Sequence, residues 1–86
     1  MKVKDTFITK DLGEAAALLC ASKKLLRLQK ETNFYWFVFY DKSSCEKISN
    51  EYWFGNLLFN AKTYNNTLKS LKNRLFRSNV EESSIL

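Results

Sequence analysis

Six aromatic rings and one valine follow one another without interruption from Phe34 to Tyr40. A run this short and this rich in aromatic residues is typical of a β-strand. Successive side chains of a strand point to opposite faces. The two alternate sets are Tyr35, Phe37 and Phe39 on one face, and Trp36, Val38 and Tyr40 on the other. Both sets are bulky and apolar, so this strand has to lie within a sheet that other elements cover on at least one side.

Two flanking segments are expected to pair with this strand. Residues 24–30 alternate in part between apolar and polar side chains, as a half-buried strand does. Only residues 31–33 separate the two strands, which predicts an antiparallel hairpin with Asn33 in the left-handed conformation. The segment from Thr6 to Thr9 consists of β-branched and aromatic residues, and it predicts a further short strand.

Three other segments have the spacing of helices. Capping-box spacing marks two helix starts, at Asp11 with Glu14 and at Ser43 with Glu46. Gly55 stands where a glycine commonly ends a helix. Apolar side chains recur at helical intervals in each segment: Leu12, Ala15, Ala16 and Leu19 in the first, Cys45, Ile48, Tyr52 and Trp53 in the second, and Ala61, Tyr64, Leu68, Leu71 and Leu75 in the third, which Asn60 is expected to cap.

The expected element order is β-α-β-β-α-(β)-α, with a short fourth strand at 57–59. We therefore predict an α+β fold, a small antiparallel sheet of three to four strands with helices packed on one face. At 86 residues the chain has room for one hydrophobic core. Residues 1–77 are expected to form a single domain. The segment 78–86 loses the apolar periodicity and is expected to be a flexible tail.

Several function classes lack the residues that they need. The chain has no histidine, which excludes histidine-containing zinc sites and the common triads, and it has no glycine-rich phosphate loop. Five acidic residues are interpreted as helix caps and helix-start charges: Asp5, Asp11, Glu14, Asp41 and Glu46. Cys20 and Cys45 are expected to be reduced thiols. No segment has the length of a membrane span. We expect a cytoplasmic protein that is not an enzyme and that has no cofactor, metal or membrane partner.

Positive charge is concentrated in two stretches. The formal net charge is +5, and no acidic residue occurs between Glu51 and Glu81, so the polar face of the third helix is wholly basic. One interpretation is a solvated lysine-rich face. The other is a contact surface for nucleic-acid phosphate or for an acidic protein surface. The candidate contacts are Lys23, Lys24, Arg27 and Lys30 in the first stretch, and Lys62, Lys69, Lys72, Arg74 and Arg77 in the second.

The aromatic strand leaves three interpretations open. Both of its faces could be covered, by the third helix wrapping round the sheet or by a second subunit. One face could instead be a stacking platform for unpaired bases, close to Arg27 and Gln29 of the paired strand. The third interpretation is a docking surface for a protein. The candidate aromatic contacts are Tyr35, Trp36, Tyr40 and Trp53.

Four segments together resemble a family of small, uncharacterised prokaryotic and mobile-element proteins known only as a domain of unknown function. They are residues 6–12, the strand at 34–39, the segment Tyr52-Trp53-Phe54-Gly55, and residues 68–76. The resemblance covers about residues 5–77 and implies a stand-alone domain with the element order given above. It implies no activity and no functional residues. Phe54 and Asn56 depart from the family pattern, which has polar or acidic residues there, and make this loop more apolar.

The sequence therefore favours a non-enzymatic nucleic-acid-binding accessory factor that uses the basic third helix. The alternative is a protein-interaction module, such as a mobile-element inhibitor or regulator of a host protein. A homodimer is compatible with both hypotheses.

Overall fold

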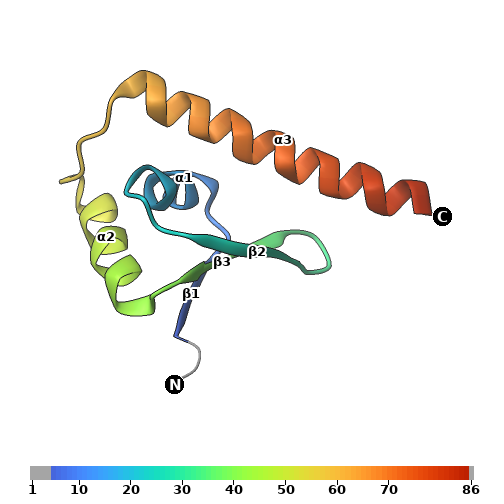
Figure 1. Ribbon diagram of the computed structural model, residues 1–86, viewed down its shortest axis with the longest axis horizontal. Coiled ribbons are helices and arrows are strands. Elements are labelled where there is room, and N and C mark those ends of the chain that lie inside the picture. Colours follow the sequence, from blue (N-terminus) through green and yellow to red (C-terminus); the bar gives the residue numbers. More distant parts are fainter. Residues whose placement is uncertain (1–4, 86) are drawn as a thin grey trace.

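The computed structural model describes the backbone of residues 5–85 and the side chains of residues 5–78. The elements follow one another as β1 (Thr6–Thr9), α1 (Leu12–Cys20), β2 (Leu25–Lys30), β3 (Tyr35–Tyr40), α2 (Lys42–Phe54) and α3 (Ala61–Ile85). The three strands form one antiparallel sheet, and the helices are packed against one of its faces (Figure 1). The predicted α+β fold is confirmed.

The aromatic strand is the centre of the sheet. β3 lies between β1 and β2, and it is antiparallel to both. The ladder pairs Phe37 with Thr9 on one side and with Leu28 on the other. The ladder of β2 has a bulge between Leu25 and Arg27. Phe37 and Phe39 are buried on the face that the helices cover, where they form the core with residues of α1, α2 and α3.

Helix α1 is the middle layer of the molecule, between the sheet and α3 (Figure 1). Its N-cap is Asp11, whose side chain accepts from the backbone N–H of Glu14 at 2.8 Å. Residues 15–18 are fully buried. Three of these four residues are alanines, and such short side chains let the helix approach its neighbours closely on several sides at once.

Two details of the local prediction are wrong. The N-cap of α2 is Asp41, not Ser43, and its side chain accepts from the backbone N–H of Ser44. The left-handed residues among the non-glycines of the described chain are Ser22 and Asp41, and Asn33 is not one of them. The hairpin turn closes instead through a bond from the N–H of Glu31 to the carbonyl of Phe34, at 2.7 Å. Gly55 does end α2, in the left-handed conformation.

The segment between α2 and α3 is irregular, so the short fourth strand predicted at 57–59 does not form. This segment joins α2 to α3 away from the sheet (Figure 1), so it does not reach the free outer edges of β1 and β2 where a fourth strand would have to pair. Asn60 caps α3 as predicted, through its side chain and the backbone N–H of Thr63 at 3.1 Å.

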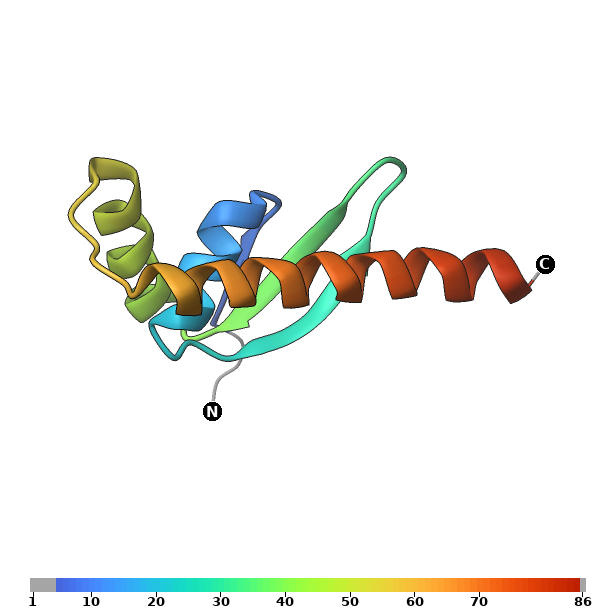
Figure 2. The ribbon, with the colours of Figure 1, turned by 90° about the horizontal axis from the view of Figure 1, so that it is seen from above.

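Helix α3 has 25 residues, which at about 1.5 Å per residue is close to the longest dimension of the molecule, 43 Å. Leu71, only 2 % exposed, anchors it on α1, and Tyr64, Leu68 and Leu75 pack beside the core. Its C-terminal end extends past the β2–β3 hairpin (Figure 2). The helix continues to Ile85, so the backbone of the predicted tail is helical to that residue. Leu86 lies outside the described residues, and the flexibility of the tail stays a prediction.

None of the helices in the described part of the chain has both the length and the apolar character needed to cross a membrane.

Candidate functional site

The outward face of α3 is basic. Its apolar seam packs on α1, and the charged side chains therefore point away from the domain. All five basic candidates of this helix are exposed: Lys62, Lys69, Lys72, Arg74 and Arg77. Amide side chains are exposed on the same helix, at Asn65, Asn66 and Asn73. This outward face of α3, residues 62–77, thus combines cations with hydrogen-bonding amides and contains no carboxylate.

The basic residues of the first stretch lie in different surroundings. Lys23 is half-buried, and its Nζ donates to Ser44 Oγ at 2.6 Å, which ties the α1–β2 connection to the start of α2. Lys24, Arg27 and Lys30 are exposed. Arg27 pairs with Val38 in the ladder, so it lies on the sheet face turned away from the helices. The structure therefore turns Arg27 away from the basic face of α3, whereas Lys30, the ladder partner of Tyr35, lies on the helix side of the sheet.

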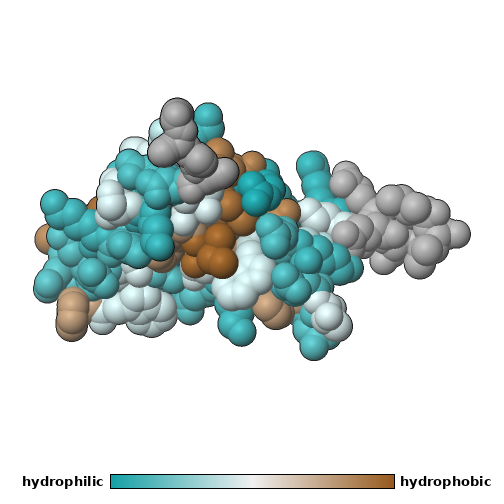
Figure 3. Space-filling model, turned by 90° about the horizontal axis from the view of Figure 1, so that it is seen from below, coloured by the Kyte–Doolittle hydropathy of each residue, from teal (hydrophilic) through white to brown (hydrophobic). Residues whose placement is uncertain are grey.

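The sheet face turned away from the helices carries an apolar patch (Figure 3). Val38 lies at its centre and is buried, because Ile8 pairs with it on one side and the bulge of β2 lies on the other. Around it Ile8 is 50 % exposed and Tyr40 is 59 % exposed, and Leu26 at the bulge is also exposed. Helix α3 does not wrap round to this face. The prediction that the third helix wraps round and covers the second face of the sheet is therefore wrong.

The four aromatic candidates occupy different surroundings. Trp36 and Tyr40 lie on the uncovered face, and Trp36 makes an edge contact with Phe34 at 5.2 Å between ring centroids. Lys10 Nζ lies over the other ring of that pair, 4.7 Å from the centroid of Phe34. Tyr35 pairs with Lys30 and faces the helix side, so it takes no part in the uncovered face.

The fourth candidate, Trp53, belongs to a buried polar cluster that sequence reasoning missed. Glu14 is 5 % exposed, and its carboxylate accepts from three side chains. Thr9 Oγ1 donates to Oε1 at 2.6 Å, and Trp53 Nε1 donates to Oε2 at 3.2 Å. Ser49 Oγ also donates to Oε2. Glu14 therefore does not complete a capping box: the backbone N–H of Asp11 donates to Thr9 Oγ1 instead.

This cluster is structural in character. Its donors come from β1 and α2 and its acceptor from α1, so it joins three elements around one carboxylate. Such a carboxylate needs its hydrogen bonds, because an unsatisfied charge inside a protein is costly. No basic side chain is among the partners, and the ring of Trp53 is still 60 % exposed.

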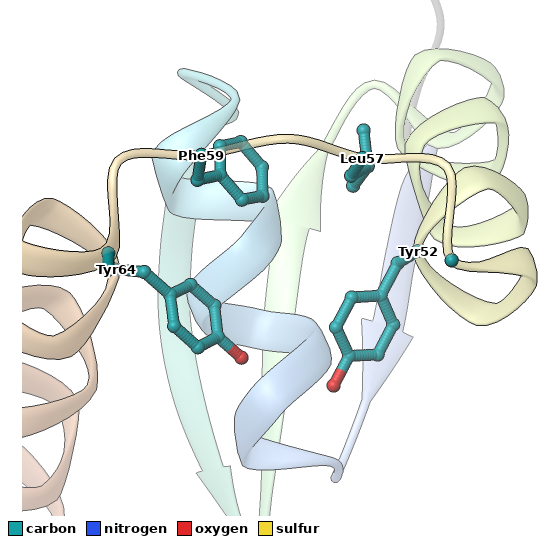
Figure 4. A pocket seen from close by; sticks show the side chains of 6 residues that line it. Tyr52, Leu57, Phe59 and Tyr64 are labelled. Atoms are coloured by element: carbon teal, nitrogen blue, oxygen red, sulfur yellow. The ribbon is translucent and has the colours of Figure 1, made fainter.

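A pocket of about 320 Å³ lies where the α2–α3 connection crosses over α1. Its walls are the rings of Tyr52, Tyr64 and Phe59 together with Leu57 (Figure 4). The rings of Phe59 and Tyr64 are parallel, with centroids 6.2 Å apart. Both tyrosine hydroxyls point toward α1, where Tyr64 Oη donates to the carbonyl of Gly13 at 3.0 Å. Burial, and then the hydrogen bond with Tyr64, raise the pKa of Tyr52 to about 12.

Both cysteines are free thiols, as expected. Cys45 is fully buried in the first turn of α2, and its Sγ donates to the carbonyl of Tyr40 at 3.3 Å. Burial raises the pKa of this thiol, against the opposing effect of Lys23. A thiol of this kind is a poor nucleophile. Within the described residues, no group of histidine, cysteine and acidic side chains could hold a metal ion.

Comparison of the chain with protein-family models, with curated proteins and with solved structures gave no match. The interpretation of these surfaces therefore depends on their own chemistry.

Proposed function

We propose that this chain is a cytoplasmic, non-enzymatic accessory factor that binds nucleic acid through the outward face of α3. The observation that carries the proposal is the composition of that face, with five exposed cations, three exposed amides and no acid over residues 62–77. An ordinary solvated helix mixes charges of both signs, because oppositely charged neighbours stabilise it. This helix lacks those pairs over four turns.

The shape of the helix supports duplex nucleic acid as the partner. An α-helix with its side chains is about 10–12 Å across, and the major groove of B-DNA is about 12 Å wide. Lysine and arginine bind phosphates and guanine edges, and asparagine binds adenine edges. Because only one side of α3 packs on the domain, the opposite side can enter a groove without moving the core.

The test is fluorescence anisotropy with labelled single- and double-stranded oligonucleotides at several salt concentrations. We expect the wild type to bind duplexes, with an affinity that falls steeply as salt rises. The triple variant Lys69→Gln, Lys72→Gln, Arg74→Gln should bind all sequences more weakly. The slope of log affinity against log salt should become shallower by about 0.9 for each lost phosphate contact.

The matched control changes cations on the other side of the molecule. The double variant Lys24→Gln, Arg27→Gln removes exposed charge from the β2 region and should bind like the wild type, apart from a small change due to net charge. The absence of binding at low salt would rule the proposal out. Losses in proportion to the number of charges removed, three in one variant and two in the other, would show that net charge, and not the face of α3, determines affinity.

A second candidate function is favoured by the apolar patch around Val38. Exposed Ile8, Leu26 and Tyr40 beside Arg27 have the composition of a protein contact, where large apolar side chains and arginine are common anchors. The chain would then act as a protein-interaction module, such as a mobile-element inhibitor or regulator of a host protein, or as a homodimer. Ile8→Lys places a charge on this patch without touching α3. It should abolish capture of a specific partner, or reduce the mass seen by light scattering to that of the monomer, while oligonucleotide affinity is kept.

A further inference from the structure

The pocket beneath the α2–α3 connection is independent of both proposed binding faces. Its lining comes from the end of α2, the irregular segment and the first turn of α3: Tyr52, Gly55, Leu57, Phe59, Ala61 and Tyr64. None of these side chains carries a charge at neutral pH. Three aromatic rings and one leucine make the walls, and the two phenol hydroxyls are the polar groups of the lining side chains.

The hydrogen bond at the floor has a fixed direction. Tyr64 Oη uses its proton on the carbonyl of Gly13. The Tyr64 oxygen is thus left with lone pairs that can accept, and the hydroxyl of Tyr52 also lies over Gly13. The floor of the pocket therefore offers an acceptor between aromatic walls.

We propose that this pocket binds a small, planar, uncharged aromatic molecule that carries one hydrogen-bond donor, of the indole or phenol class. The flat ring of the ligand lies against the aromatic walls of Phe59, Tyr64 and Tyr52, and its donor bonds to the Tyr64 oxygen. The volume of about 320 Å³ lies at the lower end of the range for ligand sites, and a dry cavity of about 150 Å³ is enough for benzene. A one- or two-ring molecule thus matches the available space.

The charge distribution also argues against an ionic ligand. An anion would have no cationic side chain among the six lining residues, and a cation would lose its water without gaining a carboxylate. Asp11, the acid closest to the floor, already accepts from the N–H of Glu14. An uncharged ligand has a small desolvation cost, and its single donor finds an acceptor in the hydroxyl oxygen at the floor.

The experiment is a titration of the full chain with indole, followed by NMR of the ring protons of Tyr52 and Tyr64. We expect saturable shifts confined to the residues that line the pocket. The ligand 1-methylindole has the same rings without the N–H donor. It should bind about fivefold to tenfold more weakly, which is the loss of one neutral hydrogen bond. Tyr64→Phe removes the accepting oxygen, so the advantage of indole over 1-methylindole should shrink.

Two variants separate specific binding from general apolar adhesion. Ala61→Leu fills the pocket from an exposed position of α3, so the fold is kept while indole shifts at Tyr52 should disappear. Leu58→Ala removes a side chain that is 94 % exposed next to the pocket but outside its lining, and it should leave the affinity unchanged. The proposal is overturned if indole causes no saturable shift at Tyr52 and Tyr64, if 1-methylindole binds equally well, or if Ala61→Leu binds like the wild type. None of these measurements depends on oligonucleotide affinity, so they test the pocket separately from the proposed nucleic-acid binding.

Discussion

At the scale of single residues, glycine is needed at position 13 because a neighbouring side chain leaves no room for a Cβ, and not because of the backbone conformation. A Cβ at this position would lie 2.5 Å from Tyr52 Oη and 3.3 Å from Tyr64 Oη. Alanine is otherwise the better helix former by about 1 kcal/mol. The two tyrosine hydroxyls therefore occupy the space that a side chain at Gly13 would take.

We expect Gly13→Ala to lower the free energy of unfolding by about 1–3 kcal/mol, the usual cost of overpacking. In the background of Tyr52→Phe, which removes the clashing oxygen, the same change should be neutral or stabilising. Urea unfolding of the four proteins of this cycle measures both effects. If Gly13→Ala stabilises the chain with Tyr52 intact, the close packing described above is wrong.

Glu14 is the other residue whose role depends on distant parts of the chain. Replacement by glutamine keeps its size but exchanges one acceptor oxygen for a donor, so one of the three hydroxyl or indole donors loses its partner. Leaving a buried polar group unsatisfied costs about 1–3 kcal/mol. We expect Glu14→Gln to lower the free energy of unfolding by this amount, measured by urea denaturation.

Glu46 provides the control for this substitution. It is an exposed acid on α2, and Glu46→Gln should change the free energy of unfolding by less than about 0.5 kcal/mol. Equal effects of the two variants would mean that the cluster around Glu14 contributes nothing beyond its charge.

The sequence could not reveal this cluster. Glu14 has ideal spacing for a capping box, and the local pattern is complete without Thr9, Ser49 or Trp53. These partners lie 5, 35 and 39 positions away, so only the packing of α1 against β1 and α2 brings them together. The same holds for the pocket, because Tyr52 and Tyr64 meet over Gly13 only after the α2–α3 connection has crossed α1.

At the scale of elements, short-range patterns were sufficient for most of the fold. The aromatic strand, the hairpin, the caps Asp11 and Asn60 and the end of α2 at Gly55 were all predicted correctly. The errors occurred where two local solutions compete. The second helix start was predicted at Ser43 because of its spacing to Glu46, whereas the cap is Asp41, two positions earlier. An apolar segment of three residues at 57–59 resembled a strand but lies away from the edges of the sheet.

Gly55 tests how an element ends. Its φ is +79°, and a Cβ there would meet no atom within 4 Å, so any cost of substitution comes from the backbone alone. We expect Gly55→Ala to lower the free energy of unfolding by about 1 kcal/mol, and Gly55→Asn by less, since asparagine tolerates this conformation better. Thermal unfolding of both variants provides the measurement. A neutral alanine would indicate that α2 can end in another way.

At the scale of the whole molecule, the uneven charge of α3 should make stability depend on salt. Lys69 and Lys72 are three positions apart on one helix and repel each other. Lys69→Glu converts this repulsion into attraction. At low ionic strength the melting temperature should rise by about 2–6 °C, since 1 kcal/mol corresponds to about 4–8 °C in a domain of this size.

Salt screens both signs of this interaction, so the advantage of Lys69→Glu should vanish at about 1 M NaCl. Lys69→Gln removes the repulsion without adding attraction, so its melting temperature at low salt should lie between those of the wild type and Lys69→Glu. Differential scanning calorimetry over a salt series checks all three proteins. A lower melting temperature for Lys69→Glu at low salt would show that this lysine has a stabilising partner.

The sandwiched position of α1 also determines the order in which the chain can become stable. Synthesis proceeds from the N-terminus, so β1 and α1 emerge first, whereas β3 and α3, which hold them, follow later. The hairpin of β2 and β3 can close as soon as residue 40 is free. The alanine surface of α1 stays uncovered until Leu71 and Leu75 have left the ribosome. The nascent protein therefore carries an exposed apolar helix until α3 has been synthesised, and its cooperative fold becomes available only then.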